Sequence, residues 1–206
     1  MKIIVVHGMM YGDEGKGKVV SSIVAALRRT GQRVLIVKFT GGPQAAHNVV
    51  WHDGHKWQHH CHAQIGSGSQ FGADTLLCAP CMVDIHSLDK EVQAFAQKTG
   101  QNFSDVAKRI YIDPDAPLIT HMHWEICKEQ ERRRGNDCHS TCGFGVGLNW
   151  KLITERKFNM VVSDLDKEDV GVKSVELAHT ICDAAGVPFK HLGAVEGHLM
   201  RNTAGL

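Results

Sequence analysis

The 206-residue chain has almost no net charge, no apolar run long enough for a membrane span, and no repeated or low-complexity segment. The formal net charge of +1 gives no overall basic field, which excludes nucleic-acid wrapping as an expected role. Residues 1–7 are too short a stretch, and too soon followed by glycine, to resemble a signal peptide. We therefore expect neither a nucleic acid nor a membrane as a partner.

The seven cysteines are an odd number and follow no secretion signal. This pattern favours free thiols in a reducing, cytoplasmic compartment over a disulfide framework. Apolar residues make up 43% of the chain and charged residues 22%, which is typical of a globular protein. The length predicts a single domain over residues 1–206.

Strand and helix patterns alternate near the N-terminus and predict an α/β fold. A β-branched run at residues 3–6 predicts a buried strand, apolar residues at helical spacing predict a helix over 19–29, and residues 34–39 predict the next strand. Such a βαβ unit implies a mostly parallel sheet. A small β-hairpin is predicted around Asp53-Gly54, because this dipeptide suits a type I′ turn.

The rest of the chain continues the alternation. Two strands are predicted, at residues 75–78 and 109–112, and three helices, over residues 86–98, 117–134 and 175–185, the last with Ser174 as its N-cap. Residues 140–147 form a second glycine-rich loop, and residues 191–206 show no clear period.

The loop at residues 12–18, with the sequence G-D-E-G-K-G-K, fits the phosphate-binding pattern G-x-x-x-x-G-K. Glycines allow a close backbone approach, and successive N–H groups before a helix attract anions. Val19 stands where such loops carry a serine or threonine for Mg²⁺, so Asp13 is the candidate metal ligand. The plainer interpretation is a glycine-rich turn with solvated lysines.

The same loop, extended to Y-G-D-E-G-K-G-K-V at residues 11–19, resembles the W-G-D-E-G-K-G-K signature of adenylosuccinate synthetases. Residues 41–48, G-G-P-Q-A-A-H-N, are similar to the family's G-G-x-N-A-G-H-T. Residues 141–147, T-C-G-F-G-V-G, resemble its T-T-G-R-G-I-G. Arg156 falls where the family has an arginine that reaches across a dimer interface. The ordered resemblance covers about residues 1–165.

The resemblance implies a ligase of purine biosynthesis that joins L-aspartate to C6 of IMP through a 6-phosphoryl intermediate, with GTP hydrolysis. Asp13 would take the N1 proton, His47 would stabilise the transferring phosphoryl group, and Mg²⁺ would lie near Asp13 and the carbonyl of Ala46. A homodimer would follow from Arg156. The implied nucleotide- and phosphate-binding residues are Gly12, Glu14, Gly15, Lys16, Gly17, Lys18, Gln44, Thr141, Cys142 and Arg156.

Several positions depart from the family pattern. Ala46, Cys142 and Phe144 replace a glycine, a threonine and an arginine, and the family's later aspartate- and base-binding segments have no match beyond a faint echo at residues 195–197. Three interpretations stay open: a short active synthetase using IMP, a dGMP-using relative of phage 2-aminoadenine pathways, or a truncated, non-catalytic nucleotide-binding or partner subunit. The phosphoryl donor is GTP or ATP.

Two further patterns suggest metal or redox chemistry. In the histidine-rich stretch 52–62, His59 and Cys61 would face one side of a strand, and His60 and His62 the other. Because a zinc site needs four convergent ligands, an ordinary hairpin strand is the favoured interpretation. Cys78 and Cys81 form a C-x-x-C pair, but no second pair accompanies them, so a structural role is favoured.

Overall fold

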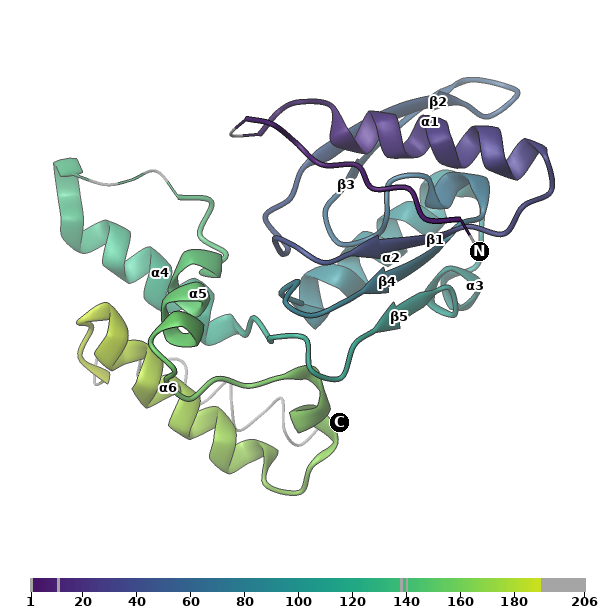
Figure 1. Ribbon diagram of the computed structural model, residues 1–206. Coiled ribbons are helices and arrows are strands. Elements are labelled where there is room, and N and C mark those ends of the chain that lie inside the picture. Colours follow the sequence, from purple (N-terminus) through teal and green to yellow (C-terminus); the bar gives the residue numbers. More distant parts are fainter. Residues whose placement is uncertain (1, 11, 138, 140, 190–206) are drawn as a thin grey trace. The chain divides into compact units, whose positions relative to one another are not determined.

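The structure is a computed structural model that describes residues 2–10, 12–137, 139 and 141–189 (Figure 1). The chain divides into two compact units, residues 1–81 with 85–113 and residues 82–84 with 114–206. Each unit is presented by itself. A single domain over residues 1–206 stays a prediction, because two compact units of one chain can still be parts of one domain.

The first unit is built on a parallel sheet with the strand order β1-β4-β5. Its strands are β1 (Leu35–Lys38), β4 (Asp74–Leu77) and β5 (Ile110–Ile112), and Lys38, Leu77 and Ile112 align at their carboxyl ends. A separate antiparallel hairpin consists of β2 (His47–His52) and β3 (Trp57–His62). The predicted α/β class, with a parallel sheet and a small hairpin, is confirmed.

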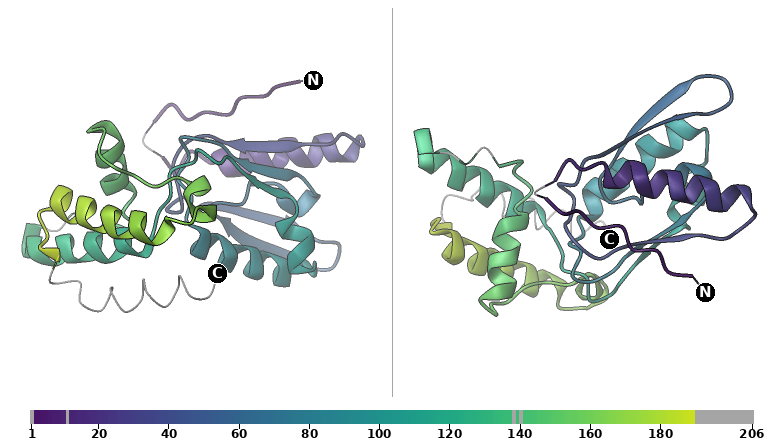
Figure 2. Two further views of the ribbon diagram at one scale, coloured as in Figure 1. Left: turned by 90° about the horizontal axis from the view of Figure 1, so that it is seen from below. Right: turned by 45° about the horizontal axis from the view of Figure 1, so that its top comes forward.

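Three α-helices accompany these strands: α1 (Lys16–Arg29), α2 (Ile85–Thr99) and α3 (Phe103–Ala107). A short 3₁₀ helix, η1 (Ser69–Phe71), precedes β4. Helix α1 runs beside the hairpin (Figures 1 and 2). Buried apolar side chains of these helices form part of the core, among them Val24, Leu88, Val92 and Phe95. The predicted helices over residues 19–29 and 86–98 therefore both exist, with slightly wider bounds.

The second unit is helical. It contains α4 (His121–Arg134), α5 (Val146–Thr154) and α6 (Val170–Ala185), with the 3₁₀ helices η2 (Gly135–Asp137) and η3 (Val162–Asp166). The three α-helices share one apolar core that includes Met122, Ile126, Leu152, Leu177 and Ile181. The sequence patterns did not predict α5, which begins inside the second glycine-rich loop. Among the residues that the structure describes, no helix is long and apolar enough to span a membrane.

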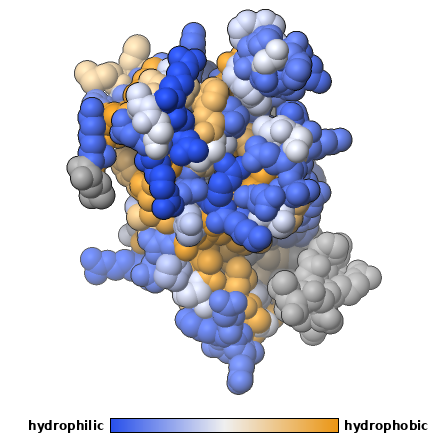
Figure 3. All heavy atoms as spheres, turned by 90° about the vertical axis from the view of Figure 1, so that its right-hand side faces the viewer, coloured by the Kyte–Doolittle hydropathy of each residue, from blue (hydrophilic) through white to orange (hydrophobic). Residues whose placement is uncertain are grey.

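The predicted strand at residues 3–6 is wrong. Ile3, Ile4 and Val5 are 74%, 45% and 66% exposed, and residues 2–8 pair with no strand of the described chain. A strand needs a hydrogen-bonding neighbour, and the amides that follow, those of Met9 and Met10, donate to Glu14 instead. The expected βαβ unit is therefore absent from the described residues. Figure 3 shows exposed hydrophobic residues (orange) between hydrophilic ones (blue) on one face of the molecule.

Hydrogen bonds shift three other predicted features. The N–H groups of Leu118 and Ile119 donate to the carbonyls of Met160 and Val83, so α4 begins at His121 rather than at 117. Ser174 lies within α6 and donates to the Val170 carbonyl, so it is no N-cap. Asp53 accepts the N–H groups that follow it at residues 55 and 56 and has no positive φ, so the type I′ turn is not formed.

The buried carboxylate of Asp164 allows the stability of the second unit to be tested. It is 6% exposed and accepts hydrogen bonds from the Val161 N–H, Lys167 and Lys173. Burial alone would raise the pKa of its carboxyl group, but the two ammonium groups and the N–H outweigh burial and hold the pKa well below its ordinary value. We expect Asp164→Asn to lower the free energy of unfolding at pH 7 by about 1–2 kcal/mol.

Because the folded-state pKa is depressed, this contribution is fully present above the unfolded-state pKa of about 3.9 and is lost as the pH falls toward the folded-state value. The difference between wild type and Asp164→Asn in urea unfolding should therefore narrow below about pH 4. Asp166→Asn, at an exposed position of the same 3₁₀ helix, is the control and should change little. An equal loss in both variants would contradict the assignment.

Candidate functional site

The loop before α1 has the backbone geometry of a tight, strained turn. Gly12, Asp13 and Gly15 have φ angles of 133°, 50° and 75°, in the region that disfavours side chains. Gly15 forms the left-handed N-cap of α1, so the helix begins at Lys16. Among the described residues only Asp13 and Arg156 have a positive φ without being glycine. Strain of this kind is concentrated at functional sites.

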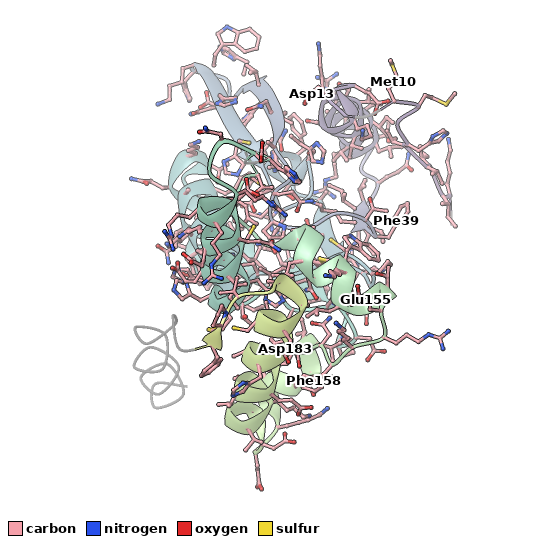
Figure 4. All side chains as sticks on the ribbon, turned by 90° about the vertical axis from the view of Figure 1, so that its left-hand side faces the viewer. Met10, Asp13, Phe39, Glu155, Phe158 and Asp183 are labelled. Atoms are coloured by element: carbon pink, nitrogen blue, oxygen red, sulfur yellow. The ribbon has the colours of Figure 1, made fainter. Side chains whose placement is uncertain are left out.

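The carboxylate of Glu14 is bound by hydrogen-bond donors of the loop. Its carboxylate accepts the backbone N–H groups of Met9 and Met10 at 2.6 and 2.5 Å, and it forms an ion pair with the Lys16 ammonium. The Lys16 hydrogen bond, followed by the Met10 amide, lowers the pKa of Glu14. Two backbone amides and an ammonium converging on a carboxylate are the donor set that also binds phosphate oxygens. Figure 4 labels Met10 and Asp13 near the start of α1.

Gly17 brings this loop against the hairpin. A Cβ atom added to Gly17 would lie 2.5 Å from the Cβ atom of His47 and 2.9 Å from Oγ of Ser67. The glycine is buried, whereas Lys18 beside it is exposed. The second glycine of the G-K-G-K motif is therefore required for packing, and it fixes the first turn of α1 beside His47.

The imidazole of His47 is affected by burial and by charged groups of both signs. Burial lowers the pKa of its imidazole most, the ammonium groups of Lys38 and Lys16 lower it further, and Glu91 raises it. The ring is therefore neutral at pH 7 and offers one N–H donor. A bound phosphate would favour the protonated ring, because a nearby negative charge stabilises the charged form.

The glycine-rich segment between β1 and β2 carries Gln44 and Ala46. Gln44 has a buried Oε1 atom without a hydrogen-bond partner in the described part of the chain. Within the described residues, the Ala46 carbonyl accepts only a long, 3.5 Å hydrogen bond from the Asn48 side chain. The exposed Asp13 carboxylate has no hydrogen bond or ion pair among the described residues. These oxygen donors match the preference of Mg²⁺ for carboxylate, carbonyl and water oxygens.

The remaining predicted residues lie in the second unit. Thr141 and Cys142 are exposed, and Oγ1 of Thr141 lies 3.6 Å from Sγ of Cys127. The loop ends at Gly145, the left-handed N-cap of α5, whose close neighbour is His123. Arg156 follows α5, is exposed and has a φ of 52°. The six cysteines of the described chain are free thiols, as predicted.

The sequence patterns did not predict the polar cluster next to His47, which includes Lys38 and Glu91. Lys38, at the carboxyl end of β1, donates to the carbonyl of Ala63, and burial lowers the pKa of its ammonium group. Glu91 of α2 accepts the N–H groups of Ala63 and Gln64. A lysine ending an otherwise apolar strand was the signal available in the sequence, because the carboxyl ends of parallel strands collect functional side chains.

Comparisons with known proteins agree on one family. The family model of adenylosuccinate synthetase matches residues 5–185. The adenylosuccinate synthetase of Ectopseudomonas mendocina (strain ymp) is 33% identical over 177 residues, which is 85% of this chain and 38% of the relative. That of Ruthia magnifica subsp. Calyptogena magnifica is 29% identical over 173 residues, 80% of this chain and 34% of the relative.

A solved structure shares the fold. The fully ligated adenylosuccinate synthetase from Plasmodium falciparum superposes with a TM-score of 0.69 at 19% identity, covering 87% of this chain and 39% of that one. The chain thus spans less than two fifths of the length of these similar proteins.

The contact at Gly17 generates a prediction. We expect Gly17→Ala to lower the free energy of unfolding by about 1–3 kcal/mol, because the added methyl group must displace His47 or α1. Gly147→Ala is a matched control. Gly147 is also the second residue of a helix with a left-handed glycine N-cap, but among the described residues no atom beyond its chain neighbours and its own helix backbone lies within 4 Å of its added Cβ.

The control should be stabilised by about 0.5–1 kcal/mol, because alanine favours a helix over glycine. Urea unfolding of both variants measures the difference. Changes of the same sign and size in both would show that Gly17 is not sterically restricted.

Proposed function

The chain belongs to the adenylosuccinate synthetase family, and we propose on this basis that it is a ligase of purine biosynthesis that joins L-aspartate to C6 of IMP. GTP is the proposed phosphoryl donor. The observation that carries the proposal is the set of anion donors around Glu14, placed next to a neutral His47 by the Gly17 contact. This set matches the needs of phosphoryl transfer, which depends mainly on positioning and on stabilising charge.

The proposed reaction has two steps. Asp13 takes the N1 proton of IMP, and O6 then attacks the γ-phosphorus of GTP while the bond to the β-phosphate oxygen breaks and GDP leaves. The amine of aspartate next attacks C6, and the C6–O6 bond breaks to release inorganic phosphate. A base at Asp13 suits the first step, because its exposed carboxylate has no competing partner in the described residues.

The other residues of the first unit have supporting roles in this proposal. The Glu14 side chain moves aside, and a phosphate takes its place on the amides of residues 9 and 10 and on the Lys16 ammonium. Lys18 adds positive charge, and the loop conformation depends on Gly12, Gly15 and Gly17. His47 donates its N–H to the transferring phosphoryl group, and Gln44 contacts the nucleotide. Asp13 and the Ala46 carbonyl would hold Mg²⁺, which neutralises phosphate charge when bound.

In the second unit, Thr141 and Cys142 are proposed to lie at the 5′-phosphate of the nucleotide. Arg156 is proposed to reach the phosphate of a neighbouring copy in a homodimer. Its exposed side chain has no ion pair or hydrogen bond within the described chain, and its backbone is strained, which suits a residue held ready for a partner.

Nucleotide binding without turnover is the second candidate function. Phe144, where the family has an arginine, packs its ring against Trp124 with centroids 5.5 Å apart. This position therefore contributes packing rather than charge to the second glycine-rich loop. Cys142 adds a weaker hydrogen-bond donor than the family's threonine. Both changes reduce the phosphate-binding capacity of that loop.

The ligase proposal predicts the effect of removing the base. We expect Asp13→Asn to lower the rate of aspartate ligation by about 10²–10⁴-fold, because asparagine cannot take the N1 proton. Asparagine tolerates the φ of 50°, so the loop should keep its backbone. The measurement is product formation from IMP, L-aspartate, GTP and Mg²⁺, repeated with dGMP and with ATP.

Asp183→Ala is the control. This carboxylate lies on the exposed side of α6 (Figure 4), and its removal should leave the rate unchanged. Full ligation activity in Asp13→Asn would contradict the assignment of Asp13 as the base. Nucleotide binding by the wild-type protein without any turnover would replace the ligase proposal by the second candidate, and turnover only with dGMP would change the substrate.

A further inference from the structure

Three side chains of the first unit converge at a buried point outside the phosphate loop. His60 and His62 are two residues apart on β3 and so face the same side of the hairpin, and Glu91 reaches that side from α2. Each offers one ligand atom, and the three atoms lie within 4.8 Å of one another. The strand alternation predicted from the sequence is correct, but the acidic partner comes from a distant helix.

The imidazole rings of both histidines are buried. His62 is 0% and His60 is 3% exposed, and all four ring nitrogens are without a hydrogen-bond partner in the described part of the chain. His60 Nε2 approaches Glu91 Oε1 only to 3.7 Å. An unpartnered buried polar group destabilises the fold, and a bound ligand would remove this destabilisation.

We propose that His60, His62 and Glu91 form a binding site for one divalent transition-metal ion of the zinc type. Two imidazoles and a carboxylate are donors that zinc accepts in sites with three protein ligands and a fourth position for water. Mg²⁺ and Ca²⁺ prefer oxygen ligands, which makes the imidazole pair selective against them. Binding draws the ligand atoms together to the spacing of about 3.4 Å that zinc-ligand bonds of about 2.1 Å impose.

The surroundings support a fixed site. Glu91 is anchored because its carboxylate accepts the N–H groups of Ala63, Gln64 and Ile65 at 2.8, 2.7 and 3.2 Å. Such hydrogen bonds to a ligating carboxylate orient it toward a metal. Phe95 of α2 contacts both histidine rings and closes the apolar side. Lys38 of β1 and His47 of β2 interact electrostatically with His62, and Cys61 of β3 interacts with Glu91.

Cobalt is a suitable probe, because tetrahedral Co²⁺ absorbs visible light and zinc does not. The full chain is freed of metal with a chelator and titrated with Co²⁺, and the bound cobalt is then displaced with Zn²⁺. We expect one tightly bound Co²⁺ per chain. His60→Phe and His62→Phe keep the ring packing against Phe95 but remove a ligand, and each should weaken binding by at least about 100-fold.

His59→Ala is the matched control, because His59 is on the same strand with its side chain on the exposed face. It should bind Co²⁺ as the wild type does. Two results would overturn the proposal. One is Co²⁺ binding in the two phenylalanine variants as tight as in the wild type, and the other is the absence of saturable Co²⁺ binding in the wild type. The variants need not fail to fold, because phenylalanine removes the unpartnered nitrogens.

Thermal unfolding provides an independent readout. Zn²⁺ should raise the melting temperature of the wild type and of His59→Ala, because a ligand that binds only the folded state stabilises it. It should not raise that of His62→Phe, whose metal-free form should be at least as stable as the metal-free wild type. A zinc-induced rise of equal size in all three proteins would place the ion on surface histidines and contradict the proposal. Ligase activity enters none of these measurements.

Discussion

Helix α1 approaches the hairpin so closely at Gly17 that a methyl group there would lie 2.5 Å from the Cβ atom of His47. Only glycine allows this approach, and the left-handed Gly15 starts the helix at the position that makes it possible. The contact places Lys16 near enough to His47 to lower the pKa of its imidazole. The loop donors and the histidine of the next motif therefore form one site, although about 30 residues separate them in the chain.

Two carboxylates of this unit, those of Glu14 and Glu91, are held by backbone N–H donors, and this defines what a ligand must do at each. Glu14 takes the loop amides and Lys16, and Glu91 takes the amides that follow β3. A nucleotide phosphate would have to replace Glu14, whereas a metal ion would join Glu91 without displacing its hydrogen bonds. The two proposed sites thus differ in charge. One exchanges an internal anion for an external one, and the other adds a cation to unpartnered imidazoles.

Local patterns predicted the class, the hairpin and the parallel strands, because glycine spacing and apolar periodicity act over short distances. The same patterns predicted a strand at residues 3–6, but β-branched residues form a strand only when a neighbour pairs with them. Local patterns also could not place Glu91, since it meets His60 and His62 only after β3 and α2 pack together. The strained φ of Asp13 and Arg156 likewise depends on the folded loops.

The central claim is that the donors now holding Glu14 bind a nucleotide phosphate. Calorimetric titration of GTP with Mg²⁺ into the wild type, Lys16→Gln and the exposed control Lys56→Gln tests it most directly. The account predicts one nucleotide per chain in the wild type and in Lys56→Gln. It predicts an affinity at least about tenfold weaker in Lys16→Gln, because a charge-assisted hydrogen bond contributes about 1.5–3 kcal/mol. Equal affinity in all three proteins, or no saturable binding by folded wild type, would contradict it.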